Sequence, residues 1–464
     1  SDAFKLALSA SEVQAPFEMA PDEKGNQLSG RFASQSLKAG LVTTDQGIRI
    51  TANLSKNQFE MKDAPVKARI DALSLSGPIT DAGANLSWRA DRIRIEDAIN
   101  LPENALFAPL LTSGQGRMTA EEITYSGGLL AARSTVEIGQ IDVTHRFDTA
   151  SGEASLRGDG LRFEPDGLQF EDLSERLRGL AVNATGQVIP AVSASWTSSE
   201  VKAAGQIELQ SVSFSTFRLG QVINLSGALN FNDFINFKTP PGQVFTVERL
   251  QITPAFGLEN GRISLELLGT QGFQLESARW PFVGGELRIE PTRWIFDEPV
   301  QNLSVSAEEW ELSRLINLFD IKDLDVQGRV SGEFPIEISG ANVFLRNAQL
   351  SSVEDGLIRY QGALGEQAST ADQYAKLAFD ALRNFEYEVL AVGADGNLTD
   401  EIVVDLALSG HNPNLLEGQV FNLNISLQSK LAELIQSAVM SASGQATSDA
   451  LVELVKQKQA AEKN

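Results

Sequence analysis

The chain has 464 residues, of which 38 are basic and 61 acidic, giving a formal net charge of −23 at pH 7, and it has no cysteine. The acidic excess argues against nucleic acid or an anionic membrane surface as a partner bound through charge. The lack of cysteine excludes disulfides, thiolate catalysis and cysteine-ligated metals. The sequence has no run of about 18 apolar residues, and its start, SDAFKLALSA, does not resemble a signal peptide. We therefore expect a soluble chain.

Alternation of apolar and polar residues with a period of two dominates the chain and predicts half-buried β-strands with one apolar and one wet face. Ser-Gly pairs return between these segments at irregular spacing and mark turns, without the fixed period of a solenoid. In chain order the alternation occurs at Ile48, Ile50, Ala52, Leu54, Ala84, Leu86, Trp88, Ile263, Leu265, Leu267, Phe334, Ile336, Ile338, Ile402, Val404, Leu406, Leu408, Phe421, Leu423, Ile425 and Leu427.

Helical signals are few. Short candidates are DLSERLRGL from Asp172 and SRLINLF from Ser313, and a stronger one covers about 370–385, where Ser369 is placed to cap STADQYAKLAFDALRNF. Residues 429–464 show helical spacing and predict an amphipathic helical tail. This tail either docks on its own domain or marks the exposed end of the sheet, where another chain adds strands.

The balance of elements raises a packing problem. An antiparallel sheet buries its apolar face against a second layer, and three or four short helices cannot cover about 25 strands. Two solutions stay open at this point. Either the sheet folds on itself as a sandwich, barrel or solenoid, or it curls around something that is not protein.

Residues that could carry chemistry are sparse. The two histidines, His145 and His411, are far apart in sequence, and we interpret both as surface or turn residues. Metalloprotease, phosphate-loop, nucleophile-elbow and calcium-loop motifs are all missing. Carboxylates are numerous, but no pair stands out as a glycosidase-like acid and base. The five tryptophans are scattered and fit packing in the core or at sheet edges. We expect no enzyme activity, no metal and no cofactor.

One long segment resembles a known family. The resemblance covers about 150 residues, from Phe217 to Gly362, and is looser beyond them, as in ADQYAKLAFDALRNFEYEVL and FNLNISLQSK. It is carried by FRLGQVINLSGALNFNDFINFKTPPGQVFTVERLQITPAFGLENGRISLELL, LESARWPFVGGELRIEPTRW, EEWELSRLINLFDIKDLDVQGRVSGEFPIEISGANVFLRNAQL and GLIRYQG. These stretches resemble the C-terminal domain of the YdbH family of bacterial envelope proteins, which is related to AsmA and TamB.

The resemblance implies a fold and a function. The fold is a long, twisted β-sheet, curled into an open groove with an apolar interior. The function is a periplasmic bridge that carries phospholipids between the inner and outer membranes of a diderm bacterium, without chemical catalysis. The resemblance further implies an N-terminal inner-membrane anchor that is absent from this sequence, and a small outer-membrane lipoprotein partner, YnbE.

These expectations translate into domains and residues. Residues 1–200 are expected to form groove repeats, 201–428 the YdbH-like domain, and 429–464 the helical tail. A strand covering 421–428 is expected to offer its edge to the lipoprotein, through Phe421, Leu423, Ile425 and Leu427. The expected lipid-lining residues are Ile263, Leu265, Leu267, Leu287, Ile289, Leu303, Val305, Phe334, Ile336, Ile338, Ile402, Val404, Leu406 and Leu408.

The main alternative is a structural or adhesive β-rich envelope protein whose apolar face is covered by protein. It predicts a dry core and no co-purifying lipid.

Overall fold

A computed structural model shows two compact units, Ser1–Ile252 (unit 1) and Thr253–Asn464 (unit 2). Each unit is built on antiparallel β-sheet. The structure describes residues 4–18, 29–45, 47–61, 66–98, 105, 107–174, 181–216, 220–253, 256–296, 298–318, 323–340, 342–362, 373–398 and 401–429. The predicted tail at 429–464 therefore lies outside the described residues, except for Ser429, which ends a strand.

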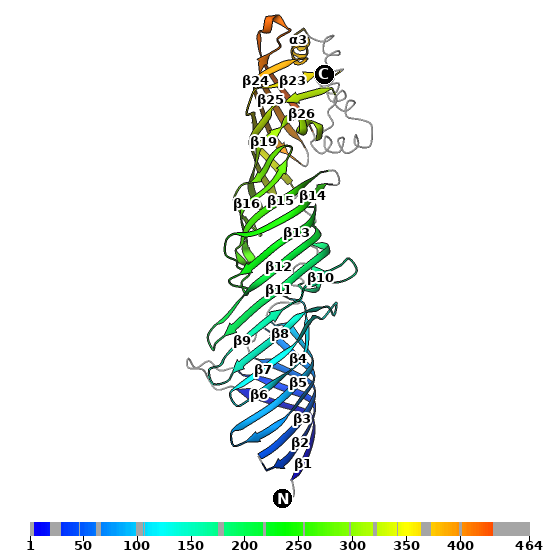
Figure 1. Cartoon of the computed structure of the whole chain (residues 1–464), viewed down its shortest axis with the longest axis vertical. Helices are drawn as coiled ribbons and strands as arrows, with labels where there is room; N and C mark the ends of the chain where they lie inside the picture. The colour runs from blue at the N-terminus through cyan, green and yellow to red at the C-terminus, as the bar shows by residue number, and fades with distance from the viewer. Residues whose placement is uncertain are drawn as a thin grey trace. The chain divides into compact units, whose positions relative to one another are not determined.

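Unit 1 contains the strands β1 to β14 (Figure 1), most of which are ten or more residues long. Their bounds are β1 Lys5–Glu18, β2 Ser29–Thr44, β3 Gly47–Met61, β4 Val66–Thr80, β5 Gly83–Asp97, β6 Leu110–Thr119, β7 Glu122–Ala131, β8 Glu137–Arg146, β9 Ser151–Arg157, β10 Leu161–Phe163, β11 Val182–Trp196, β12 Val201–Thr216, β13 Gly220–Phe231 and β14 Gln243–Thr253.

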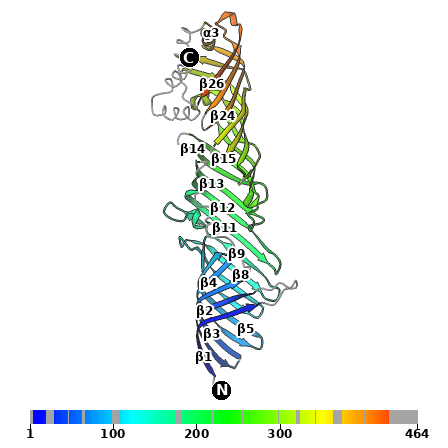
Figure 2. The ribbon, with the colours of Figure 1, turned by 180° about the vertical axis from the view of Figure 1, so that it is seen from behind.

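The strands of unit 1 pair in chain order, each antiparallel to the next, from β1 to β9 and from β11 to β14. Both β9 and β10 lie along the same edge of β11, each covering part of its length. Figure 2 shows the same succession from behind. Antiparallel neighbours in chain order can be joined by short hairpin turns. This agrees with the Ser-Gly pairs that mark turns in the sequence.

Alternate strands at the start of unit 1 carry a bend in mid-strand. Glu12, Lys56 and Arg92 have φ of 54°, 48° and 52°, in the left-handed region that side chains other than glycine rarely adopt. Such residues bend a strand as a β-bulge does. Before the bend in β3 the fully buried residue is Ala52, and beyond it the fully buried residue is Asn57, at a position of the other parity.

In its described residues, unit 2 contains the strands β15 to β26 and two short α-helices. The strand bounds are β15 Phe256–Leu267, β16 Gly272–Phe282, β17 Gly285–Ile289, β18 Thr292–Ile295, β19 Val300–Glu311, β20 Leu324–Gln327, β21 Arg329–Ser339, β22 Asn342–Ser352, β23 Gly356–Tyr360, β24 Phe385–Asn397, β25 Ile402–His411 and β26 Val420–Ser429. The helices are α1 Leu312–Leu318 and α3 Gln373–Leu382.

In unit 2 the main pairing runs from β15 through β16, β17, β19, β21, β22, β24 and β25 to β26. β20 pairs with β23, which in turn pairs with the start of β24. The predicted helix from Ser313 is confirmed as α1, and the one at 370–385 is confirmed in its described part as α3. The candidate from Asp172 falls mostly outside the described residues; Asp172 itself ends one turn of 3₁₀-helix, Phe170–Asp172, and Leu173 and Ser174 are not helical.

The part of each unit that the structure describes contains a hydrophobic cluster sealed by protein. In unit 1 the segment from β10 to the 3₁₀ turn packs Leu161, Phe163 and Leu168 against strands β7, β8, β11 and β12. In unit 2 the helices α1 and α3 and the short strands β20 and β23 cover the apolar side chains at the start of β24. Fully buried Tyr387 lies at the centre of that cluster and donates a hydrogen bond to the Gln327 carbonyl at 2.8 Å. Burial, together with the charges of Glu354 and Asp355, raises the pKa of Tyr387 to about 12.

The stretch ARWPFVGGELRIEP forms the hairpin between β16 and β17. Phe282 pairs with Gly285, so Val283 and Gly284 alone make the turn. Both have positive φ, 41° and 86°, which is the conformation of a two-residue type I′ turn. Glycine at 284 therefore meets a backbone requirement, and a Cβ on Gly285 would collide with the Glu308 carbonyl.

These features confirm the predicted fold class: a mostly β protein with long, unclosed antiparallel sheet and few short helices. Among the described residues, neither α-helix is long and apolar enough to cross a membrane.

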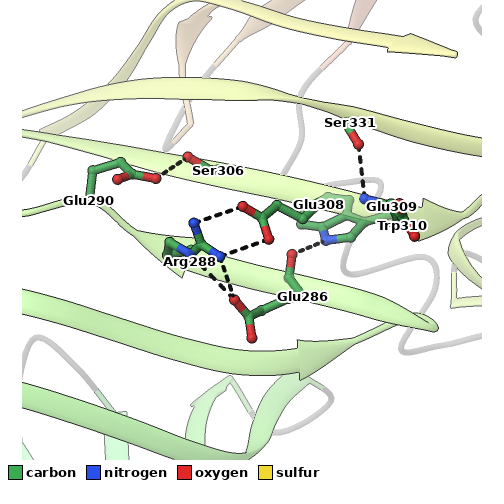
Figure 3. A network of polar contacts seen from close by, with 8 residues as sticks. All are labelled: Glu286, Arg288, Glu290, Ser306, Glu308, Glu309, Trp310 and Ser331. Carbon is green, nitrogen blue, oxygen red and sulfur yellow. Dashed lines mark hydrogen bonds and ion pairs between the residues drawn. The ribbon is translucent and has the colours of Figure 1, made fainter. Parts of the chain in front are cut away.

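The polar face of β17 and β19 carries a charge network (Figure 3). Glu286 and Glu308 are direct cross-strand partners, an arrangement in which like charges repel. Arg288 lies between them, with contacts of 3.0 Å to Glu286 and 2.8 Å to Glu308, and these bonds raise its pKa. Next to them, Glu290 accepts a hydrogen bond from Ser306 at 2.6 Å. Arg288 thus ties short β17 to β19.

We predict that Arg288→Met lowers the free energy of unfolding by about 1 kcal/mol, because the opposed carboxylates lose their shared cation. Arg288→Glu should cost more, since it adds a third carboxylate to the pair. Urea unfolding at low salt and at about 1 M salt checks both, because screening should shrink the difference between the variants. Equal stability of both variants and wild type at low salt would contradict this role.

Candidate functional site

The strands of unit 1 align their apolar side chains into rows that run across the sheet. Because side chains of paired residues share a face, the register defines each row. One row, here called the central row, passes through Leu8, Ala39, Ala52, Leu75, Trp88, Gly116, Tyr125, Val143, Ala154, Ala194 and Ala203. A parallel row nearer the hairpin turns, the rim row, passes through Leu86, Met118, Ile123, His145, Gly152, Trp196 and Val201.

Much of this apolar face is not covered by the described part of the protein. Leu8 is 55% exposed, Met118 39% and Val201 59%. Most other members of the two rows are half-buried. A soluble protein rarely exposes such a contiguous apolar surface unless it binds something.

Aromatic side chains on this face lie over glycines of the neighbouring strand. Trp88 pairs with Gly116, and a Cβ on that glycine would lie 2.7 Å from the indole ring. Tyr125 pairs with the same glycine and stacks on Trp88 with ring centroids 5.4 Å apart. In the rim row, Trp196 lies in the same way over Gly152. The missing Cβ lets each ring rest on the sheet, so large aromatic groups cover the backbone.

A few polar groups interrupt the apolar face of unit 1 beyond the strand bends. Buried Thr112 bonds the Tyr125 hydroxyl at 2.6 Å, and burial raises the pKa of Tyr125. Buried Asn57 donates from Nδ2 to the Ile70 carbonyl at 3.2 Å, while its Oδ1 has no protein partner among the described residues. These groups are local hydrogen-bonded features without a nucleophile or an acid–base pair.

In unit 2 the structure places the predicted lining residues on a shared face. Ile263 pairs with Ala278, which pairs with Ile289, and the row continues through Val305 to Phe334. The neighbouring predicted residues fall into flanking rows that connect Leu287 with Ala307, Leu303 with Ile336, Gln301 with Ile338, Gly396 with Ile402, Ala394 with Val404, Val392 with Leu406, Leu390 with Leu408, Leu265 with Leu275 and Leu267 with Phe273.

The surroundings of these residues differ along unit 2. Leu287, Phe334, Leu406 and Leu408 pack against the protein-sealed cluster under α1 and α3. Ile263, Leu265, Leu267, Ile289, Leu303, Val305, Ile336, Ile338 and Val404 are half-buried and outside that cluster, whereas Ile402 is buried. Contact of any of them with lipid stays a prediction.

The predicted partner strand is β26. It pairs with β25 over ten residues, from Ile402 with Ser429 to His411 with Val420. Phe421 and Leu423 pack against the cluster of unit 2, and Leu406 and Val404 pair with Ile425 and Leu427. No further strand pairs with the other edge of β26 within the described chain.

The polar face of unit 1 is hollowed in two places. One open hollow of about 830 Å³ is lined mainly by hydroxyl, amide and charged side chains of β3 to β8, and another of about 940 Å³ by those of β8 to β12 and the loop after β13.

Within the described residues, no three His, Asp or Glu side chains gather as metal ligands. His411 lies 3.7 Å from Glu386 at the end of β25.

Sequence reasoning missed part of this face. It assigned strands to Ile48–Leu54 and Ala84–Trp88 but placed all lining residues in the second half of the chain. It also took His145 for a surface or turn residue, and it predicted packing roles for the tryptophans, which buried Trp280 and Trp310 fulfil, without predicting the glycines beneath some of them. His145 lies within β8 on the apolar face, and each of Trp88, Trp196 and Trp280 lies against a glycine.

Comparison with known proteins places the chain in a family. The family model described as intermembrane phospholipid transport protein YdbH-like matches residues 3–443, well beyond the 150 residues that carry the resemblance in the sequence. No curated protein and no solved structure matches. Because the match covers nearly the whole chain, this protein belongs to the YdbH-like family of intermembrane phospholipid transport proteins.

Proposed function

We propose that this chain carries phospholipids across the periplasm between the inner and outer membranes, with the acyl chains lying on the apolar faces of its sheets. The family assigns intermembrane phospholipid transport in general. The central row of unit 1 supports a path along the sheet. It crosses eleven successively paired strands, β1 to β9, β11 and β12, and none of its residues carries a carboxylate or a cationic group.

The energetics favour such a path. Exposing about 15 methylenes of an acyl chain to water costs about 12 kcal/mol at about 0.8 kcal/mol each. An apolar face removes most of that cost, because the chain exchanges water for aliphatic and aromatic contacts. Movement along the face needs no catalytic group, and the head group stays in solvent at the rim of the sheet. The function therefore requires continuity of the face more than any single residue.

The bends in unit 1 support a groove in place of a flat surface. Leu110 and Ala131, at the ends of β6 and β7 away from the rim row, belong to the same hydrophobic cluster as Ile141 and Leu156 in β8 and β9. The two halves of the strands therefore face a shared interior. In this proposal the rim formed by hairpin turns is the open seam, through which head groups reach water.

We predict that Leu265→Asp reduces bound phospholipid at least about tenfold, because an ionised carboxylate on this face cannot be desolvated by acyl chains. Lipid extraction and native mass spectrometry of protein purified from a diderm host measure the bound lipid. Arg262→Asp is the matched control, since Arg262 is exposed on the polar face of the same strand, opposite Arg279. Ile338→Asp should repeat the loss. Normal lipid content in a folded Leu265→Asp protein would contradict the lining role, and lipid-free wild type would favour a structural envelope protein.

The proposal extends to partners. The edge of β26 is suited to add a strand from a small outer-membrane lipoprotein of the YnbE type, because backbone hydrogen bonds supply affinity at a free strand edge. An inner-membrane anchor would hold the opposite end of such a bridge.

We predict that a single cysteine at Asn422 or Asn424 in β26 crosslinks to this lipoprotein in the periplasm. The chain has no native cysteine, so each introduced cysteine is the only one in the protein. A cysteine at Ser9 in β1 serves as the control at another strand edge. Crosslinks from Ser9 alone, with none from β26, would contradict the assignment of the partner edge.

A further inference from the structure

His145 occupies an unusual place on the apolar face of unit 1. It lies one residue before the end of β8, and its cross-strand partners are Ile123 and Gly152. The hairpin turn that follows spans only 147–150. The imidazole therefore sits in the rim row, between the apolar interior and the turns that form the edge of the sheet.

Neighbouring rings hold the imidazole in a defined orientation. Trp196 stacks on it with centroids 6.2 Å apart and planes at 15°, and Phe147 meets it edge-on at 5.6 Å. Trp196 reaches this position because it lies across Gly152, where a Cβ would collide with the indole. Gly152 and Trp196 thus act as positioning residues for His145.

The hydrogen bond between these rings fixes the tautomer. The Trp196 Nε1–H donates to His145 Nδ1 at 3.1 Å. Indole nitrogen can only donate, so Nδ1 must be the acceptor, and the proton of the neutral imidazole resides on Nε2. Within the described residues Nε2 has no protein acceptor, and the side chain is half-buried.

The residues around His145 favour a hydrogen-bond acceptor for Nε2 that belongs to a partly apolar ligand. The other members of the rim row from Leu86 to Val201 are aliphatic residues, glycine and tryptophan. Val143, two residues before His145, lies in the central row. A hydrogen-bond donor at the edge of such a face matches a ligand whose apolar part lies on the rows and whose anionic oxygens lie at the rim.

We propose that His145 Nε2 donates a hydrogen bond to a phosphodiester oxygen of a phospholipid whose acyl chains lie on the central row. This inference rests on the proposed function and adds a defined head-group contact to it. Free phosphate has the same acceptor oxygens, but it has no apolar part that could bind to the adjoining central row and rim row.

The two histidines of the chain make this contact measurable. In protein labelled with ¹⁵N-histidine, the spectrum contains His145 and His411 alone, and His411→Gln assigns them. The probes are phosphatidylethanolamine, diacylglycerol with the same acyl chains, and inorganic phosphate. Lipid extraction from the same samples reports separately whether lipid is bound.

We expect phosphatidylethanolamine to shift the Nε2 resonance of His145, while diacylglycerol binds without this shift and inorganic phosphate has no effect. His145→Phe should lower the preference for phosphatidylethanolamine over diacylglycerol about tenfold, the worth of one hydrogen bond to a charged group. Trp196→Phe should mix the two tautomers of His145, because the indole donor to Nδ1 is lost, and the Nδ1 and Nε2 resonances report this directly.

The outcomes separate the two proposals. Bound phosphatidylethanolamine without a His145 shift, or an equal shift with diacylglycerol, overturns the head-group contact and leaves lipid transport standing. If inorganic phosphate without lipid shifts the His145 resonance as much as phosphatidylethanolamine does, the head-group contact is overturned in favour of a simple anion site. Failure of both lipids to bind the folded protein overturns the proposed function itself.

Discussion

The structure depends on one constraint: the side chains of paired residues in an antiparallel sheet share a face, so a period-two sequence places all apolar residues on one side. In unit 1 this produces rows that cross strand after strand, such as the row from Leu8 to Ala203. The hydrophobic effect demands a cover for such a face, and the described chain supplies that cover only in places. Transported acyl chains complete the missing layer in our account, which relates the sparse helices directly to function.

The covered places have a common design. In unit 1 a short strand and a 3₁₀ turn bring Leu161, Phe163 and Leu168 onto the face. In unit 2 the helices α1 and α3 do the same around Phe385 and Tyr387. These clusters give each unit a dry protein core that holds the fold together, while the half-buried rows beside them remain available to a ligand. In our account, stability and ligand contact thereby belong to different parts of the same face.

Alternation was enough to predict a mostly β chain with half-buried strands, and helical spacing predicted α1, because these follow from local periodicity. The open sheet was expected from the family resemblance, since the residues alone left a closed sheet equally possible. It could not predict which residues meet across strands. The contact of Trp196 with Gly152 and His145 joins residues about 50 positions apart, and only the register of β8, β9 and β11 reveals it. The bends at Lys56 and Arg92 were also hidden, because a left-handed conformation at a charged residue has no glycine to signal it. Lining residues were predicted only in unit 2, where the family resemblance lies, and the apolar rows of unit 1 were missed.

The central claim is that acyl chains lie on the apolar face, and site-specific photo-crosslinking tests it most directly. A photoreactive phenylalanine analogue at Leu86 points to the apolar face, and the same group at Ser87 points to the exposed polar face one residue away. Irradiation in a diderm host followed by mass spectrometry identifies lipid adducts. Our account predicts phospholipid adducts at Leu86 and none at Ser87. Equal adducts at both positions, or none at Leu86 in a folded and correctly localised protein, would contradict it.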